Sequence, residues 1–124
     1  MRDIIKTNGI ATPVGPFSAG VVAGGGIYVS GQVGQDPATG ALVSGGVAAE
    51  AEQALKNLST ILGAGGRTLD EVTRVGIYLT SMADFPAVNA VYAKHFTQPY
   101  PARTTIGVAA LPLGAAVEID AVAH

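Results

Sequence analysis

The segment from residue 47 to residue 62 constrains the fold most, because its apolar residues recur every three or four positions. That period is typical of an amphipathic helix, which must bury one side against another part of the protein. The repeating residues are Val47, Ala51, Ala54, Leu55, Leu58, Ile61 and Leu62. Glycines at positions 63, 65 and 66 predict the end of this helix.

The segments on either side of this helix have the composition of strands. Residues 3–6, 17–22 and 26–32 precede it, and three glycines from position 24 would form the turn between the second and third of these strands. Residues 72–80 follow the helix and alternate between an apolar and a more polar face. The period therefore changes from two to three or four and back again along the chain.

A second helix and two more strands complete the prediction. Asp84 is the expected N-cap of the helix, and Pro86 fits its first turn. Its apolar stripe consists of Phe85, Val88, Tyr92 and Phe96. Residues 104–110 and 116–122 read as strands joined by the sequence LPLG. We expect these last two strands to pair as a hairpin.

The predicted order is β-β-β-α-β-α-β-β, in one α+β domain that spans residues 1–124. Two one-sided helices can cover only one face of the sheet. Only 13% of the residues are charged and 48% are hydrophobic, which is thin polar cover for a small monomer. We therefore expect the second face of the sheet to pack on other subunits.

Charge and composition argue against several classes of function. The net charge is −2 and there is no cluster of Lys and Arg, so nucleic-acid binding is unsupported. The chain has no cysteine, which excludes disulfides and thiol catalysis, and no metal-ligand spacing suggests a metal site. No apolar run approaches the length of a membrane span, and the N-terminal residues do not resemble a signal peptide. A cytoplasmic location is expected.

Arg103 and Glu118 are the candidate functional residues, because no other charge lies between them and Arg103 opens an apolar strand. On the predicted hairpin they would project from neighbouring positions. They could form a cross-strand ion pair on a wet face, worth under about 1 kcal/mol. Alternatively, the planar fork of Arg103 could bind a substrate carboxylate, while Glu118 handles a water or a proton. The pattern leaves both interpretations open.

Several stretches of the sequence match the motifs of a known family. They are VGPFSAG (14–20), IYVSGQVGQDPATGALV (27–43), DFPAVNAVYAKHF (84–96), PARTTIGVAALP (101–112) and VEIDAVA (117–123). These stretches resemble the RidA/YjgF family of enamine/imine deaminases. Together they cover nearly the whole chain. The resemblance implies the family's α+β fold, which is similar to that of a bacterial chorismate mutase. It also implies a homotrimer whose sheets line a central barrel, with three sites in the clefts between subunits.

The chemistry that the resemblance implies needs no cofactor. Members of the family hydrolyse the imine derived from 2-aminoacrylate, 2-iminopropionate, to pyruvate and ammonium. By resemblance, Arg103 would hold the substrate carboxylate and Glu118 would orient or activate water. Ser30 and Gly31 would line the pocket, and Thr105 would contact the ligand through its backbone. The small-molecule carboxylate is then the only expected partner besides the other subunits, with no nucleic acid and no membrane.

One position departs from the family pattern. Phe17 stands where the family's GPYS motif has tyrosine, so the aromatic ring is kept and the hydroxyl is lost. This change admits a more apolar substrate or slower chemistry. Asn89, in the VNAVY motif, is interpreted as architectural. Two alternatives to the small-imine deaminase remain: a deaminase of a larger enamine acid such as 2-aminomuconate, and a non-catalytic module that binds 2-oxo acids. RNA cleavage, ascribed to some relatives, conflicts with the acidic net charge.

Overall fold

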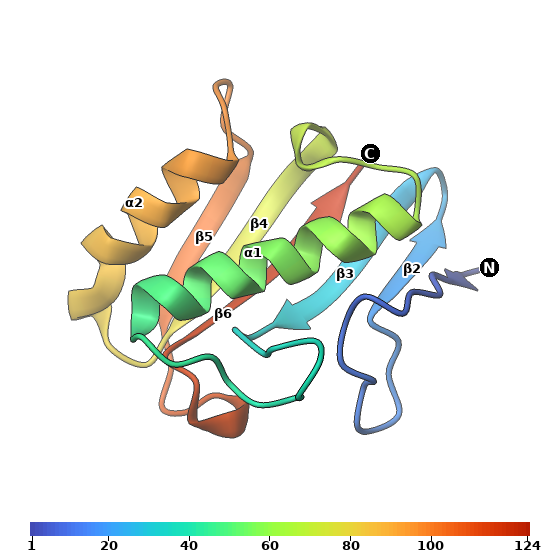
Figure 1. Ribbon diagram of the computed structural model, residues 1–124. Coiled ribbons are helices and arrows are strands. Elements are labelled where there is room, and N and C mark those ends of the chain that lie inside the picture. The colour runs from blue at the N-terminus through green and yellow to red at the C-terminus, as the bar shows by residue number, and fades with distance from the viewer.

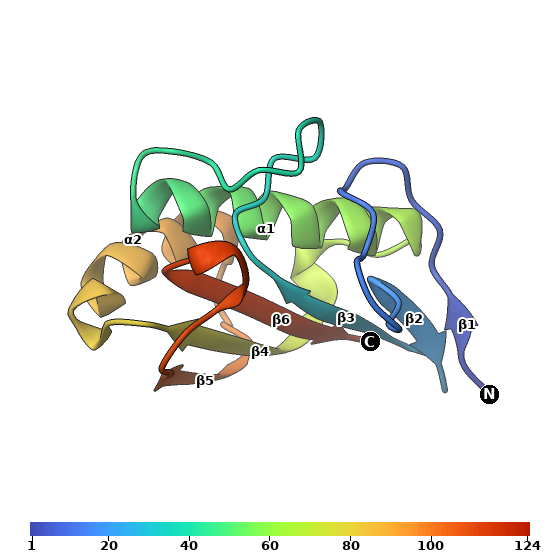
Figure 2. The ribbon, with the colours of Figure 1, turned by 90° about the horizontal axis from the view of Figure 1, so that it is seen from below.

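A six-stranded sheet carries both long helices on one face (Figures 1 and 2). The structure is a computed structural model that describes residues 1–124. The strands are β1 (Asp3–Ile4), β2 (Gly20–Ala23), β3 (Gly26–Gln32), β4 (Val72–Leu79), β5 (Ala102–Gly107) and β6 (Val117–Ala123). The helices are α1 (Val47–Ala64) and α2 (Phe85–His95), with short 3₁₀ turns η1 (Leu69–Glu71), η2 (Met82–Asp84) and η3 (Pro112–Gly114). The predicted α+β class and order of elements are confirmed.

The order of strands across the sheet is β1-β2-β3-β6-β4-β5, and only the β4–β5 pair is parallel. The predicted hairpin between the last two strands is therefore wrong, because β4 lies between β5 and β6. Helix α2 provides the crossover that a parallel pair requires. β4 satisfies its backbone groups on both sides, with Val75 level with Arg103 on β5 and with Ala121 on β6.

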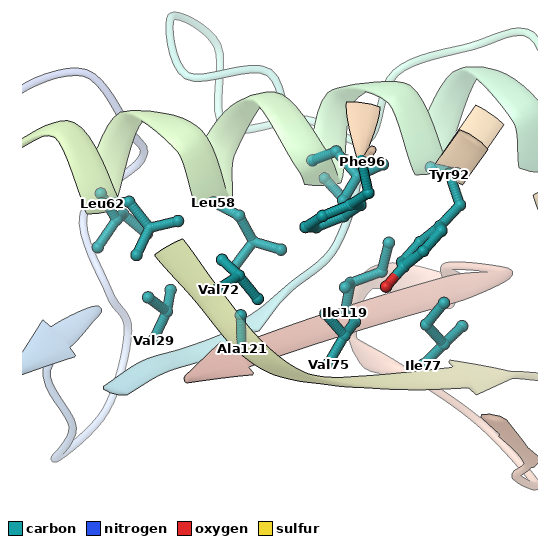
Figure 3. Close-up of a cluster of buried hydrophobic side chains, with 14 of the residues drawn as sticks. Val29, Leu58, Leu62, Val72, Val75, Ile77, Tyr92, Phe96, Ile119 and Ala121 are labelled. Atoms are coloured by element: carbon teal, nitrogen blue, oxygen red, sulfur yellow. The ribbon is translucent and has the colours of Figure 1, made fainter. Parts of the chain in front are cut away.

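The core fills the space between the helices and one face of the sheet, as Figure 3 shows. Leu58 and Leu62 of α1 point toward the sheet, and Tyr92 and Phe96 of α2 stack on each other with ring centroids 4.4 Å apart. The sheet contributes alternate residues, which explains the period of two. Those labelled in the figure are Val29, Val72, Val75, Ile77, Ile119 and Ala121.

A buried acid fixes the start of β6. Glu50, in the first turn of α1, is only 7% exposed, and its Oε1 accepts a hydrogen bond of 2.8 Å from the backbone N–H of Ala116. An acid in the first turn of a helix is usually solvated or interacts with the helix dipole, and the burial of Glu50 excludes a solvated position. The contact anchors the loop that leads into β6, the strand that carries Glu118.

The opposite face of the sheet carries no helix (Figure 2). Every second residue of each strand, between those that point into the core, faces this side of the sheet. The strand register aligns several apolar side chains on this face in a row across the strands. Ile4 is 58% exposed there, and Tyr28 and Ile106 are each 44% exposed. We call this surface the bare face. Neither helix is long and apolar enough to cross a membrane.

Candidate functional site

Arg103 lies near the start of β5 and faces the helices, because its register partner is the buried Val75. Its guanidinium carbon lies 4.7 Å from the ring centroid of Tyr92 and 5.6 Å from that of Phe85. Nη2 donates a hydrogen bond of 2.8 Å to Oδ1 of Asn89. Two aromatic rings and one amide oxygen thus hold the guanidinium in place.

Arg103 has no acidic partner within its subunit. The only ion pairs of the chain are Arg67–Glu71 and His95–Glu52. Beside the guanidinium lies a cavity of about 300 Å³, lined by Asn89, Tyr92, Ala93, Tyr100, Pro101 and Arg103. Because no carboxylate lines this cavity, the positive charge of Arg103 is available to an anionic ligand. A guanidinium group matches a carboxylate well, since it can form two parallel hydrogen bonds with it.

Glu118 projects from β6 on the bare face, between the buried residues Val117 and Ile119. Its carboxylate occupies the space over Gly31, where a Cβ atom would collide with it. Partial burial raises the pKa of Glu118, and the negative charge of Asp120 raises it further. A carboxylate with a raised pKa is suited to exchange a proton near the working pH.

Asp120 lies two residues further along the same face of β6 and is held by a neighbouring strand. Tyr78 Oη donates a hydrogen bond of 2.8 Å to Oδ2 of Asp120, which raises the pKa of the tyrosine. Gly76 leaves room for this pair, since a Cβ there would lie 2.9 Å from the Tyr78 hydroxyl and closer still to Asp120. Asp120 is therefore a fixed negative charge close to Glu118.

A second cavity, of about 400 Å³, adjoins Glu118. Among the sequence-predicted site residues it is lined by Phe17, Gly31 and Glu118, and Glu118 is the only ionisable residue in its wall. Ser30 lines an adjacent hollow with Phe17, and its hydroxyl donates a 2.6 Å hydrogen bond to the carbonyl of Ser18. The cavity beside Glu118 therefore holds a candidate base but no cation.

The structure does not bring Arg103 and Glu118 together within one subunit. Arg103 faces the helices and Glu118 faces the other way, with β4 between their strands. Glu118 is level with Tyr78, and Arg103 with Val75. Two strand spacings and three residues of strand separate the Cα atoms by roughly 14 Å. Neither the expected neighbouring positions nor a cross-strand ion pair exists.

Two further residues belong to the Arg103 side of the site. Asn89, interpreted from the sequence as architectural, is the hydrogen-bond acceptor for Arg103, and Tyr92 supplies the nearer ring. Their spacing of three on α2 places them on one helix face, a signal the sequence does contain. Thr105 lies on the same face of the sheet as Arg103, and its Oγ1 is buried without a hydrogen-bond partner.

No group of three or more acidic or histidine side chains could hold a metal ion.

The sequence model of the endoribonuclease L-PSP family matches residues 8–124. The chain belongs to this family. It is the RidA/YjgF family that the sequence resembles, so that prediction is confirmed.

Individual relatives support the same assignment. A human protein named 2-iminobutanoate/2-iminopropanoate deaminase is 46% identical over 99% of this chain and 90% of its own length. A putative endoribonuclease from Thermotoga maritima superposes with a TM-score of 0.95 at 41% identity, covering 99% of this chain and 97% of its own. RidA from an Antarctic Psychrobacter species does so with a TM-score of 0.95 at 38% identity, covering 98% of each chain.

Proposed function

We propose that this RidA/YjgF member is a cofactor-free deaminase that hydrolyses small 2-imino acids to 2-oxo acids and ammonia. The observation that carries the proposal is the separation of charges. The Arg103 cavity has a cation and no acid, whereas the Glu118 cavity has an acid and no cation. A 2-imino acid needs both, because it has a carboxylate to bind and a C=N carbon to hydrate. The name of the 46% identical human relative supports the same reaction class.

The two cavities complement each other when they come from two subunits. A head-to-tail ring brings a different surface of each subunit against its neighbour, so it can place Arg103 of one beside Glu118 of the next. The apolar bare face, with Ile4, Tyr28 and Ile106 exposed, supports such an assembly. A homotrimer with three sites between subunits satisfies both observations.

Hydrolysis then follows from the chemistry of the two side chains. Arg103 binds the carboxylate and withdraws electron density from the adjacent imine carbon. Glu118 accepts a proton from a water as the water oxygen adds to that carbon, and it passes this proton to the imine nitrogen, which gives a carbinolamine. Glu118 then accepts the carbinolamine's hydroxyl proton and delivers a proton to the amino group as the C–N bond breaks, which releases ammonia, forms the C=O bond of the 2-oxo acid and leaves Glu118 ionised. Each positioned group contributes on the order of 10²- to 10⁴-fold.

The test is ammonia release from an imine generated freshly by an amino-acid oxidase, measured with and without the protein. We expect the protein to accelerate release and the Glu118→Gln variant not to do so. Asp70→Asn, which removes an acid outside the Glu118 cavity, is the matched control and keeps the rate. Binding of 2-oxobutyrate without any acceleration of ammonia release would instead establish a binding module.

A further inference from the structure

The part of the site that one subunit contributes around Glu118 is roomy and mostly apolar. Its volume of about 400 Å³ equals that of roughly a dozen liquid waters. Apolar side chains form most of its wall away from Glu118. They are Ile10, Val14, Phe17, Val33, Pro112 and Leu113. If the carboxylate of a substrate is held by Arg103, this apolar space is left for the substrate's own side chain.

Leu113 is the most unusual of these residues. It is the only non-glycine residue with positive φ (φ 61°, ψ 15°), and it is 58% exposed at the edge of the cavity. Left-handed backbone is unfavourable for a leucine, and asparagine or glycine would fit it better. Backbone strain of this kind concentrates at functional sites. Leucine is thus unfavourable for the left-handed backbone of this turn, but its side chain adds to the apolar wall of the cavity.

The polar groups of the cavity offer little to a charged substrate side chain. The amide nitrogens of Gln32 and Gln35 already donate to the backbone carbonyls of Ser30 and Gly40. Glu118 is the only charged residue in the wall, and it repels a second carboxylate. The cavity therefore disfavours dicarboxylic substrates such as 2-aminomuconate.

We propose that Leu113 and Phe17 form a subsite for an unbranched aliphatic side chain, so that 2-imino acids with longer chains are the preferred substrates. This inference rests on the proposed deaminase function and specifies its substrate class. Burial of one methylene is worth about 0.8 kcal/mol, which converts to roughly a fourfold gain in kcat/KM for each added methylene. Phe17, which is 54% exposed, lines the cavity and presents no hydroxyl to the side chain of the substrate.

The test compares imines generated by an amino-acid oxidase from alanine, 2-aminobutyrate, norvaline and norleucine. We expect kcat/KM to rise about fourfold with each methylene. In Leu113→Asn, which suits the left-handed backbone, the ratio of norleucine-derived to alanine-derived rates falls at least fivefold, whereas Leu113→Met keeps it. Met82→Asn, at a comparably exposed apolar residue outside the cavity, keeps the wild-type ratio.

The outcomes separate this inference from the function on which it rests. Acceleration of all four imines with rates that stay level or fall with chain length overturns the subsite alone. The same holds if Leu113→Asn, with its melting temperature intact, keeps the wild-type ratio. Absence of acceleration for every imine overturns the deaminase function and the subsite together.

Discussion

Arg103 and Glu118 project from opposite faces of one sheet, with β4 between the strands that carry them. Within a subunit they lie roughly 14 Å apart at their Cα atoms, which is too far for both to act on one small imino acid. Each lines a cavity of its own, and neither cavity contains the charge that the other provides. A shared substrate therefore requires two subunits.

Arg103→Ala should lower kcat/KM for 2-imino acids about a hundredfold or more, the worth of a charge-assisted bidentate contact on the order of 3 kcal/mol. Its melting temperature should change little, because no carboxylate within the subunit depends on Arg103. Arg67→Ala, which removes an arginine that does have an acidic partner, is the control and keeps full activity. An Arg103→Ala protein that melts far earlier but retains full specific activity would show that this arginine is structural.

Glu118→Gln should abolish hydrolysis and preserve binding of 2-oxobutyrate, because it removes the base and leaves Arg103 in place. Titration calorimetry and ammonia release measure the two properties separately. Loss of binding together with activity would instead assign Glu118 to holding the ligand.

The same variant should be more stable than the wild type at pH 7. The pKa of Glu118 is raised above 4.5 in the folded protein, so the folded state binds its proton more tightly than the unfolded chain does. This raised pKa makes wild-type stability fall as the pH rises from about 4.5 through the folded-state pKa. We expect Glu118→Gln to raise the melting temperature at pH 7 and to lose that gain near pH 4.5. A gain that does not vary with pH would contradict the partial burial of an ionised carboxylate.

Asp120→Asn should move the acidic limb of the pH–rate profile to lower pH. Asp120 is one of two causes that raise the pKa of Glu118, so removing its charge lets Glu118 ionise earlier. The asparagine retains an oxygen for the Tyr78 hydroxyl, which preserves the local hydrogen bond. Asp70→Asn should leave the profile in place. A profile that does not move in Asp120→Asn would remove Glu118 as the group that titrates.

Phe17→Tyr should raise the rate on 2-iminopropionate, because the added hydroxyl can position water or support proton transfer at the imine. The ring is 54% exposed, so the hydroxyl costs little stability. Steady-state rates and melting temperatures of the two proteins provide the comparison. An equal or lower rate with an unchanged melting temperature would mean that this cavity does not use a hydroxyl at position 17.

Local periodicity predicted the elements of the fold well. The period of three to four in residues 47–62 appears as α1, and the stripe containing Val88, Tyr92 and Phe96 packs as expected. The pairing of the last two strands was predicted wrongly, because the order of strands in a sheet depends on contacts distant in sequence. One signal was available: β4, α2 and β5 follow one another as strand, helix and strand, the usual sequence of a parallel crossover.

The candidate residues of the site were easier to select from the sequence than their arrangement in space. Arg103 and Glu118 could be selected because few charges occur around them, and the family resemblance gave each a role. The support of Arg103 by Asn89 and Tyr92 depends on α2 packing beside β5, which a linear pattern does not report. The hydrogen bond that Glu50 accepts from Ala116 could not be predicted, because it links residues far apart in sequence.

Subunit complementation tests the central claim most directly. Arg103→Ala and Glu118→Gln proteins are unfolded together in equal amounts and refolded, so that both kinds of subunit enter the proposed trimers. If each site takes Arg103 from one subunit and Glu118 from its neighbour, about one quarter of the sites regain both residues, and activity returns to about one quarter of the wild-type value. Arg103→Ala refolded with a chain carrying both substitutions should regain none. Mixed trimers, verified by mass, that remain as inactive as the two parent proteins would contradict a site shared between subunits.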